Sequence, residues 1–524
     1  MKKIIPILSF VFISISLWAQ QIDTLGGSPS INQRELQVIL QQWTITDNAA
    51  GLAFSNVNRG GFTTLEWFNG QGNHHRMQEG SARNGLNFFS EGFSSFSEKI
   101  HARGRFAFHK ELEQDRAWSD VMNTYNANPY IFGSNVRGDY DSQIFDLDLN
   151  IFTNPVGRFT FGLAFDYKVA DVSRQRDPRS RTYMLDYAVL PSVVYALNPN
   201  SRVGINVLYR YDKERMPNLS TVQTDPNLQY FTFSGLQNVD GRIGGYRAFQ
   251  RQFISEYLGG SVQYNYHTDN MSLLIAPGFQ IQNQETLGDK KQSPGSYNAN
   301  HLYGTASLLM MNEQFVHQLE LKAAYTDGGA DEYRQSLFTE RDEETGTSTE
   351  YWVTDYKYKN RYIISTTDAD LSWKTYGLRP NQKEYSWSAG LDAAYSAFTN
   401  KYYLPESFYE SEKLFGGVNG SVFILNRDYH RLELGASFMA GFALHGALDL
   451  YEDNEFSLQV LRPDLEYHNR DTYQVGGFLK YNFPMRFVER SRMSGYARIY
   501  GEKLIAENSH DWFTINIAIG LLTF

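Results

Sequence analysis

The stretch FDLDLNIFTNPVGRFTFGLAFDYK, residues 145–168, decides the fold of this chain. Apolar and polar side chains alternate over residues 145–151, and they alternate again over 158–168, after the turn residues 154–157. Successive side chains of a strand point to opposite faces, so each half has one apolar face and one charged face. Two such strands joined by a tight turn are typical of a transmembrane β-hairpin.

The same two-residue period recurs along the chain and predicts about eighteen strands, with sixteen as the other even number that fits. Tight turns alternate with long polar loops near 112–141, 213–252, 327–356, 400–411 and 449–468. Short turns at one rim and long loops at the other indicate an all-β fold, a transmembrane antiparallel β-barrel of the outer membrane with both termini periplasmic. The expected strands lie near 60–69, 84–96, 98–112, 142–153, 157–170, 181–197, 201–213, 254–268, 270–285, 296–312, 314–327, 356–375, 384–399, 409–425, 429–447, 468–483, 488–503 and 510–524.

The beginning of the chain predicts export from the cytoplasm. Lys2 and Lys3 precede an apolar run over 4–18, and the small residue Ala19 follows. This pattern is typical of a secretory signal peptide. We therefore expect three parts, which are a signal peptide over 1–20, an N-terminal segment over 21–59 and the β-barrel over 60–524.

Composition excludes several other classes of protein. The chain has no cysteine, so backbone pairing and packing must hold it together. Loss of Lys2 and Lys3 with the signal peptide reduces Lys+Arg from 48 to 46, against 58 Asp+Glu, a formal charge of −12. A negative chain without a basic run argues against a nucleic-acid partner. No mature segment reaches the roughly 18 apolar residues that a transmembrane helix needs.

The last thirteen residues, WFTINIAIGLLTF, are the expected closing strand of the barrel. Closure requires this strand to pair with the first one, so that no backbone edge remains unpaired in lipid. A bulge at Leu521 and Leu522 would bring the terminal Phe524 into phase with the lipid face, because one extra residue moves every later side chain to the other face. The expected lipid face consists of Phe513, Ile515, Ile517, Ile519 and Leu521.

Several of these features resemble known outer-membrane proteins. The terminal Phe524 resembles the signal by which the barrel-assembly machinery recognises its clients. The signal ending LWAQQ, the missing cysteine and the Tyr-rich strands resemble Bacteroidota-type outer-membrane proteins. More narrowly, the chain looks like an uncharacterised barrel family often encoded beside TonB-dependent receptors and surface lipoproteins. This resemblance brings no catalytic or binding residues.

A weaker likeness lies in the stretch DNAAGLA, residues 47–53. It is similar to the Asn-Pro-Ala-Gly-Leu stretch that opens the hatch of fatty-acid-transporter-like barrels. Ala49 stands where those proteins have proline, and the expected strand number exceeds their fourteen. The likeness implies a hydrophobic cargo.

The N-terminal segment carries a candidate plug. Leu36, Ile39, Leu40 and Trp43 recur at helical spacing, which predicts a short amphipathic helix over 35–43. Such a helix could lie inside the barrel as a plug, or it could pack on the periplasmic rim. The sequence leaves both interpretations open.

Charged residues on the polar faces of the strands are the candidate lumen lining. They could set the ion selectivity of a water-filled pore. Alternatively, opposite charges on adjacent strands could pair and make the barrel rigid, and the mixture of signs favours this second interpretation. The candidates are Asp146, Asp148, Arg158, Asp166, Lys168, Arg202, Arg210, Glu320, Lys322, Arg431 and Glu433.

Motifs for catalysis or metal binding are weak. The neighbours His74 and His75 point to opposite sides of an extended chain, so a metal would need ligands from elsewhere. The acidic residues 340–344 could bind calcium, but a solvated run of charges is the simpler interpretation. Neither G-x-S-x-G nor H-E-x-x-H occurs. We therefore expect no cofactor, no metal and no catalytic residue.

The sequence thus predicts a non-enzymatic outer-membrane barrel that forms a transport or diffusion channel for a small solute. An alternative is an accessory or scaffold barrel of a TonB-dependent surface uptake complex, whose loops dock a receptor or a surface lipoprotein. An outer-membrane enzyme is the least favoured alternative. The expected partners are outer-membrane lipid and, during biogenesis, the barrel-assembly machinery.

Overall fold

The computed structural model describes residues 31–55, 60–125, 127–222, 228–243, 249–341, 344, 346–380, 384–427, 430–485 and 493–523. The expected signal peptide over 1–20 lies outside these residues. So do the first part of the N-terminal segment, Phe524, and residues 342, 343 and 345.

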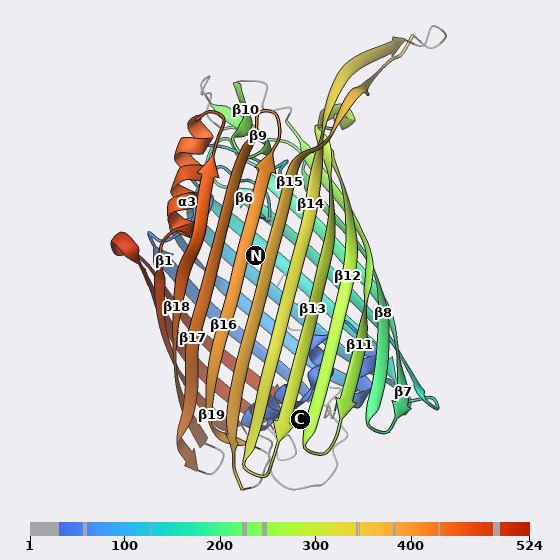
Figure 1. The fold of residues 1–524 in the computed structure, drawn as a ribbon, viewed down its shortest axis with the longest axis vertical. Coiled ribbons are helices and arrows are strands. Elements are labelled where there is room, and N and C mark those ends of the chain that lie inside the picture. Colours follow the sequence, from blue (N-terminus) through green and yellow to red (C-terminus); the bar gives the residue numbers. More distant parts are fainter. Residues whose placement is uncertain are drawn as a thin grey trace.

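Within the described residues, eighteen strands form one antiparallel sheet that closes on itself (Figure 1). The last strand pairs with the first, and this pairing closes the barrel. The predicted fold class is therefore confirmed, and each predicted strand overlaps one observed strand. The strands are β1 (Gly60–Gly72), β2 (Ala82–Ser95), β3 (Ile100–Arg116), β5 (Gly138–Thr153), β6 (Phe159–Arg174), β7 (Arg181–Asn198), β8 (Ser201–Met216), β11 (Arg251–His267), β12 (Met271–Leu287), β13 (Gly295–Met311), β14 (Phe315–Arg341), β15 (Ser348–Leu378), β16 (Tyr385–Tyr402), β17 (Ser407–Arg427), β18 (His430–Asp449), β19 (Thr472–Met485), β20 (Met493–Ala506) and β21 (His510–Thr523).

The two ends of the barrel differ in their connections. At one end the connections are tight turns, such as 154–158, 199–200 and 312–314. At the other end, the connections 117–137 and 217–250 carry a second, three-stranded sheet. Its strands are β4 (Phe132–Gly133), β9 (Gln229–Gly235) and β10 (Asn238–Ile243). The connection 450–471 carries the π-helix η5 (Ser457–Leu461) and the helix α3 (Arg462–His468).

Two of the predicted loops are largely strand. Most of 327–356 belongs to β14 and β15, which form a hairpin that projects beyond the rim (Figure 1). The connection predicted over 400–411 shrinks to 403–406. In both places cross-strand pairing continues past the point where the apolar alternation ends. The sequence there is polar, and this is why it suggested a loop.

Exposure alternates along the strands as the two-residue period predicts. Ile519 is 58% exposed, whereas its neighbour Ala518 is 2% exposed. The same contrast separates the exposed Leu163 from the buried Ala164. Rows of apolar side chains therefore cover the outside of the barrel, and the alternate residues face the inside. No helix among the described residues is both long and apolar enough to cross a membrane.

The seam between β1 and β21 corrects one expectation. Its pairing runs from Gly61↔Thr523 to Gly72↔Trp512 without a register shift, so the bulge predicted at Leu521 and Leu522 is absent. Leu522 instead faces inward, where it is buried against Tyr496. This inward contact stabilises the regular alternation up to the end of the described strand.

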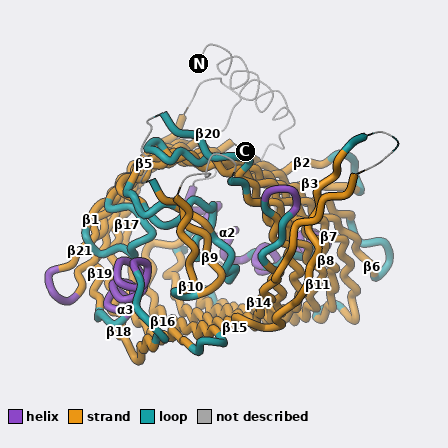
Figure 2. Tube along the Cα trace, turned by 90° about the horizontal axis from the view of Figure 1, so that it is seen from above, coloured by secondary structure: helices purple, strands orange, loops and turns teal. Residues whose placement is uncertain are grey.

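Three short helices lie inside the ring, near the end with the tight turns (Figures 1 and 2). They are the α-helix α2 (Ile31–Leu40) and the 3-10 helices η1 (Gln42–Ile45) and η2 (Ala49–Phe54). We call the described residues 31–55 the inner segment. A large cluster of buried apolar side chains, contributed mainly by the connections 117–137, 217–250 and 450–471, lies at the opposite end. We call the described residues of these three connections the outer lid.

Candidate functional site: the barrel lumen

The inner segment packs its apolar side chains on the barrel wall. Leu36 is buried against Leu309, Val316, Tyr376 and Tyr385. Trp43 is buried with Ala50, Val194 and Leu274, and Ile39 packs on the edge of the first of these clusters. Leu40 is 38% exposed, so it belongs to neither contact. Of the four candidate plug residues, three therefore contact the wall.

Polar side chains of the inner segment bond to the wall as well. Gln42 Nε2 donates to the carbonyl oxygens of Ser272 at 3.0 Å and of Ser307 at 2.9 Å. Asn48 Nδ2 donates to Gln263 Oε1 at 2.7 Å. Among the described residues, every hydrogen bond between this segment and the wall includes a side chain on at least one side. Buried polar groups need such partners, and bonds of this kind can exchange for water without breaking the sheet.

One wall glycine lets the segment approach closely. A Cβ on Gly162 of β6 would lie 2.2 Å from the amide nitrogen of Ala50. That amide donates to Ser192 Oγ at 3.1 Å. Any larger residue at position 162 would therefore displace backbone, not merely a flexible side chain. Glycine at position 162 is therefore required for η2 to pack this closely on the wall.

An ionic contact holds α2, at the other end of the inner segment, against the wall. Glu35 of α2 accepts hydrogen bonds from Lys480 Nζ and from the hydroxyl of Tyr385, the latter at 3.0 Å. Lys480 Nζ also pairs with Glu433 Oε2 at 3.3 Å. Arg431 pairs nearby with Glu384 at 2.7 Å. Two of the candidate lumen residues, Arg431 and Glu433, therefore lie in paired, buried contacts close to the inner segment.

Four of the other nine candidate lumen residues form cross-strand pairs. Asp146 pairs with Lys168 at 3.6 Å, and Asp148 pairs with Arg105. Arg210 pairs with Asp186 at 2.7 Å.

Three of the remaining five candidates have other neighbours. Asp166 lies opposite Asp148 in the pairing of β5 with β6. Arg202 lies over the ring of Phe54, 4.3 Å from its centroid. Arg158 does not line the lumen, because it lies in the turn before β6 and donates at 3.5 Å to the hydroxyl of Tyr195.

Water reaches another part of the inner wall. Glu320 and Lys322 of β14 share a face with the inward-facing Val316, and Lys322 is exposed. Its cross-strand partner Asp370 and the next inward residue of β15, Asp368, are exposed too. The inner wall around Lys322 of β14 and Asp370 of β15 is therefore charged and solvated. By contrast, η2 covers the wall over β5–β7, and α2 covers the tight-turn end of β13–β16.

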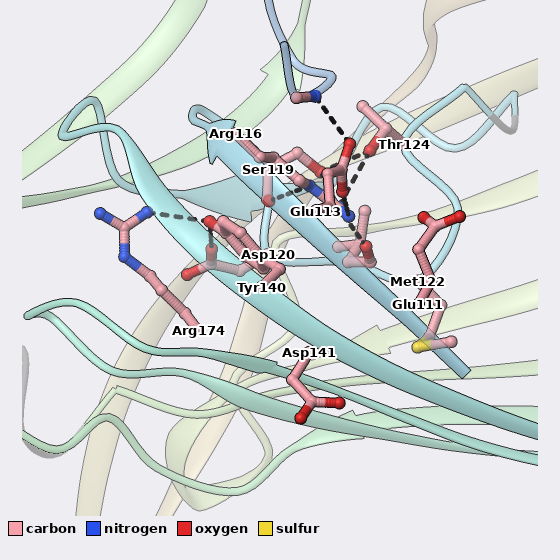
Figure 3. A network of polar contacts seen from close by, with 12 residues as sticks. Glu111, Glu113, Arg116, Ser119, Asp120, Met122, Thr124, Tyr140, Asp141 and Arg174 are labelled. Atoms are coloured by element: carbon pink, nitrogen blue, oxygen red, sulfur yellow. Dashed lines mark hydrogen bonds and ion pairs between the residues drawn. The ribbon is translucent and has the colours of Figure 1, made fainter. Parts of the chain in front are cut away.

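The outer lid is fixed by a buried polar network (Figure 3). Both oxygens of the fully buried Asp120 accept hydrogen bonds from tyrosine hydroxyls, from Tyr140 at 2.5 Å and from Tyr230 at 2.6 Å. Burial raises the pKa of Tyr230 well above its ordinary value, so its hydroxyl stays protonated and donates. Arg116 donates to the carbonyl oxygen of Val121 at 2.7 Å and so holds the start of the same connection.

Several of these residues were absent from the sequence-based candidates. Lys480 could have been found by the face rule, because it occupies an inward position of a predicted strand. Glu35 lies in the predicted helix, but its partner Lys480 is 445 positions away in the chain. Asp120 and Tyr230 lie in connections without any hydrophobic period, so no sequence signal joins them.

The two candidate metal-binding histidines have other partners in the structure. The ring of His74 stacks on Tyr467 with centroids 4.4 Å apart. His75 contacts the carbonyl oxygen of Arg76 through Nδ1 at 2.8 Å. In the described part of the chain, no group of three or more His, Cys, Asp or Glu residues is arranged to hold a metal ion. Two residues of the acidic stretch 340–344 lie outside that part.

Comparison with known proteins gives a family but no curated relative. No curated protein sequence matches the chain significantly. Among solved structures, the chain is similar to the copper transporter OprC, with a TM-score of 0.37 and 8% identity over 88% of this chain and 81% of that one. It is also similar to a Pseudomonas aeruginosa FadL homologue, with a TM-score of 0.31 and 11% identity over 91% and 92% of the two chains. For OccAB3 from Acinetobacter baumannii the TM-score is 0.33, with 9% identity over 89% and 99%. Residues 49–524 match the model of DUF6850, a family of unknown function, and the chain therefore belongs to that family.

Proposed function

We propose that this protein is a transport barrel of the outer membrane whose lumen is closed at rest by the inner segment. The apolar outside of the barrel suits lipid, and the charged inside suits a water-filled lumen. By the same proposal, the end with the tight turns and the C-terminus faces the periplasm, and the outer lid faces the exterior.

The packing of the inner segment on the barrel wall is the observation that supports this proposal. A barrel of about eighteen strands is wide enough to leave an aqueous lumen unless something fills it. Here the inner segment packs on β5–β7 through η2 and on the tight-turn end of β13–β16 through α2. These contacts are made through a few side chains and one close approach at Gly162. Such contacts can be released while all strand pairs stay intact. Further along β14 and β15, the exposed Lys322 and Asp370 supply a charged surface for a small polar solute.

A second candidate function is an accessory role in a surface uptake complex. The observation in its favour is the projecting hairpin of β14 and β15. Phe338 and Tyr351 stack on this hairpin with centroids 6.4 Å apart, and both remain exposed. Exposed aromatic side chains supply contact area for a receptor or a lipoprotein.

Solute uptake into liposomes distinguishes the two functions. The mature chain and a variant that lacks residues 21–55 are reconstituted, and heat-modifiable migration on gels checks that both have folded. We expect slow uptake of a small sugar with the intact chain and rapid uptake with the deletion variant. Slow uptake with a folded deletion variant would contradict transport and favour the accessory role. Rapid uptake with the intact chain would contradict closure by the inner segment.

A further inference from the structure

Four basic side chains contact the ring of Tyr467 in the outer lid, and a fifth lies nearby. Tyr467 of α3 stacks with His74 at 4.4 Å between centroids and packs edge-on with His468 at 5.3 Å. Arg76 lies 5.8 Å and Lys413 Nζ 5.4 Å from the centroid of the same ring. Arg470, three residues further along the chain, belongs to the same electrostatic neighbourhood as His74 and Lys413. We call these five residues with Tyr467 the basic cluster.

The nearby carboxylates are bonded to other groups. Asp464 Oδ1 accepts from the amide of Met77 at 3.0 Å. Glu79 Oε2 accepts from the amide of Arg76 at 3.1 Å, and Asp471 Oδ1 accepts from the amide of Ala443 at 3.0 Å. Glu466 pairs with Arg470 at 3.3 Å. Each acid therefore already has one donor, and three of the four accept from backbone. Glu79 and Asp464 also lie in the electrostatic neighbourhood of Arg76, and Asp471 lies in that of Lys413.

Two of the basic residues are left without adequate partners. Lys413 is 8% exposed, and its Nζ donates only a long bond of 3.4 Å to the carbonyl oxygen of Tyr467. No carboxylate lies within salt-bridge distance of Lys413 among the described residues. His74 is 6% exposed, and its Nδ1 has no hydrogen-bond partner within that part of the chain. Burying an ammonium or an imidazole nitrogen without a partner is costly, so native structures rarely retain one without a reason.

We propose that the basic cluster binds the oxyanion group, phosphate or carboxylate, of a small solute. An oxyanion would accept from Lys413 and from the partnerless His74, and it would offer the planar guanidinium of Arg76 a bidentate acceptor. The rings of Tyr467 and Tyr125 give such a solute an apolar surface beside the charge, because Arg76 lies only 4.1 Å from the centroid of Tyr125. This binding site requires no flux through the barrel and is therefore independent of the transport proposal.

The position of the cluster supports an external ligand. His74 and Arg76 belong to the connection between β1 and β2, and Tyr467, His468 and Arg470 belong to the connection between β18 and β19. Lys413 faces inward from β17. Two connections at the long-loop end and one wall strand therefore meet here, where a solute arriving from that end would first contact the lumen.

Calorimetric titration of the full mature chain in detergent with inorganic phosphate tests the site. We expect saturable binding, a loss of affinity of roughly ten-fold or more for Lys413→Met, and no change for Lys503→Met. Lys503 is the matched control because it is exposed and pairs with Asp511 at 3.0 Å. Ionic strength is held constant with sodium chloride.

A stability measurement separates loss of binding from loss of folding. Lys413→Met removes a buried charge that has no carboxylate within salt-bridge distance in the described part of the chain. Without phosphate the variant should therefore unfold at the same or a higher urea concentration than the parent chain. Phosphate should then stabilise the parent chain but not the variant. The proposal is wrong if phosphate gives no saturable heat, if Lys413→Met binds as well as the parent, or if chloride displaces phosphate equally well.

Discussion

Lys480 of β19 pairs with Glu433 of β18 at 3.3 Å, and the same ammonium also reaches Glu35 of the inner segment. The side chains of Lys480 and Glu433 are only 8% and 4% exposed, so neither has water as an alternative partner. One cation therefore joins two strands of the wall to the segment that lies inside them.

Removal of this cation should destabilise the barrel itself. In Lys480→Met the carboxylate of Glu433 stays buried without its partner, and the free energy of unfolding should fall by about 3–5 kcal/mol. Glu35→Gln leaves the Lys480–Glu433 pair intact and should cost much less, because Glu35 is the more exposed partner. Urea unfolding from lipid vesicles measures both. Equal losses in the two variants would show that Glu35, not Glu433, is the main partner.

Two adjacent alanines test which face of the wall meets lipid. Ala393 on β16 is exposed on the outside, and Ala394 faces the lumen opposite Asp370 of β15. Ala393→Arg places a charge in the apolar belt and should cost on the order of 2–4 kcal/mol if the position lies near the bilayer centre. Ala394→Arg places the same charge beside a carboxylate and should cost far less. Refolding stability in vesicles compares the pair, and similar costs would refute the assignment of faces.

The buried His468 makes stability depend on pH. Burial, together with Arg76 and Lys413, lowers its pKa to about 3, well below the ordinary value of the unfolded chain. Above the unfolded pKa neither state binds the proton, so the contribution of His468 is fully present. As the pH falls, only the unfolded state is protonated, and unfolding becomes easier until the pH reaches the folded pKa.

His468→Phe isolates this effect, because phenylalanine suits the aromatic neighbours Phe398, Tyr409 and Tyr467. The loss of unfolding free energy between about pH 7 and about pH 5 should be smaller in the variant by roughly 1–2 kcal/mol. Unfolding is followed by tryptophan fluorescence at both pH values. An identical loss in the parent chain and the variant would mean that His468 is not shielded from protons.

The strands were predictable from sequence because the barrel wall is governed by one local rule. Lipid outside and polar contacts inside impose opposite demands on adjacent residues, so Ile519 and Ala518 differ as the rule requires. The rule also placed Lys322 and Glu433 on the inner face. It failed for Arg158, which lies one residue before β6, where the alternation continues in sequence but the strand does not.

The outer lid was not predictable, because its contacts join residues far apart in connections without a period. Tyr230 meets Asp120 across 110 positions, and α3 lies in a stretch whose polar composition suggested only a loop. The packing of the inner segment was predictable from the sequence only in part. Helical spacing identified Leu36 and Trp43, but nothing in the sequence pairs Gly162 with Ala50.

Closure of the lumen by the inner segment is tested most directly by single-channel recording of two glycine variants of the full mature chain. Gly162→Val places side-chain atoms against the amide of Ala50. The control is Gly104→Val on β3, where the added Cβ would meet no other atom within 4 Å. We predict a nearly silent parent chain, frequent large openings for Gly162→Val and a silent Gly104→Val. Large conductance in the parent chain, or a folded Gly162→Val barrel that stays as silent as Gly104→Val, would contradict the account.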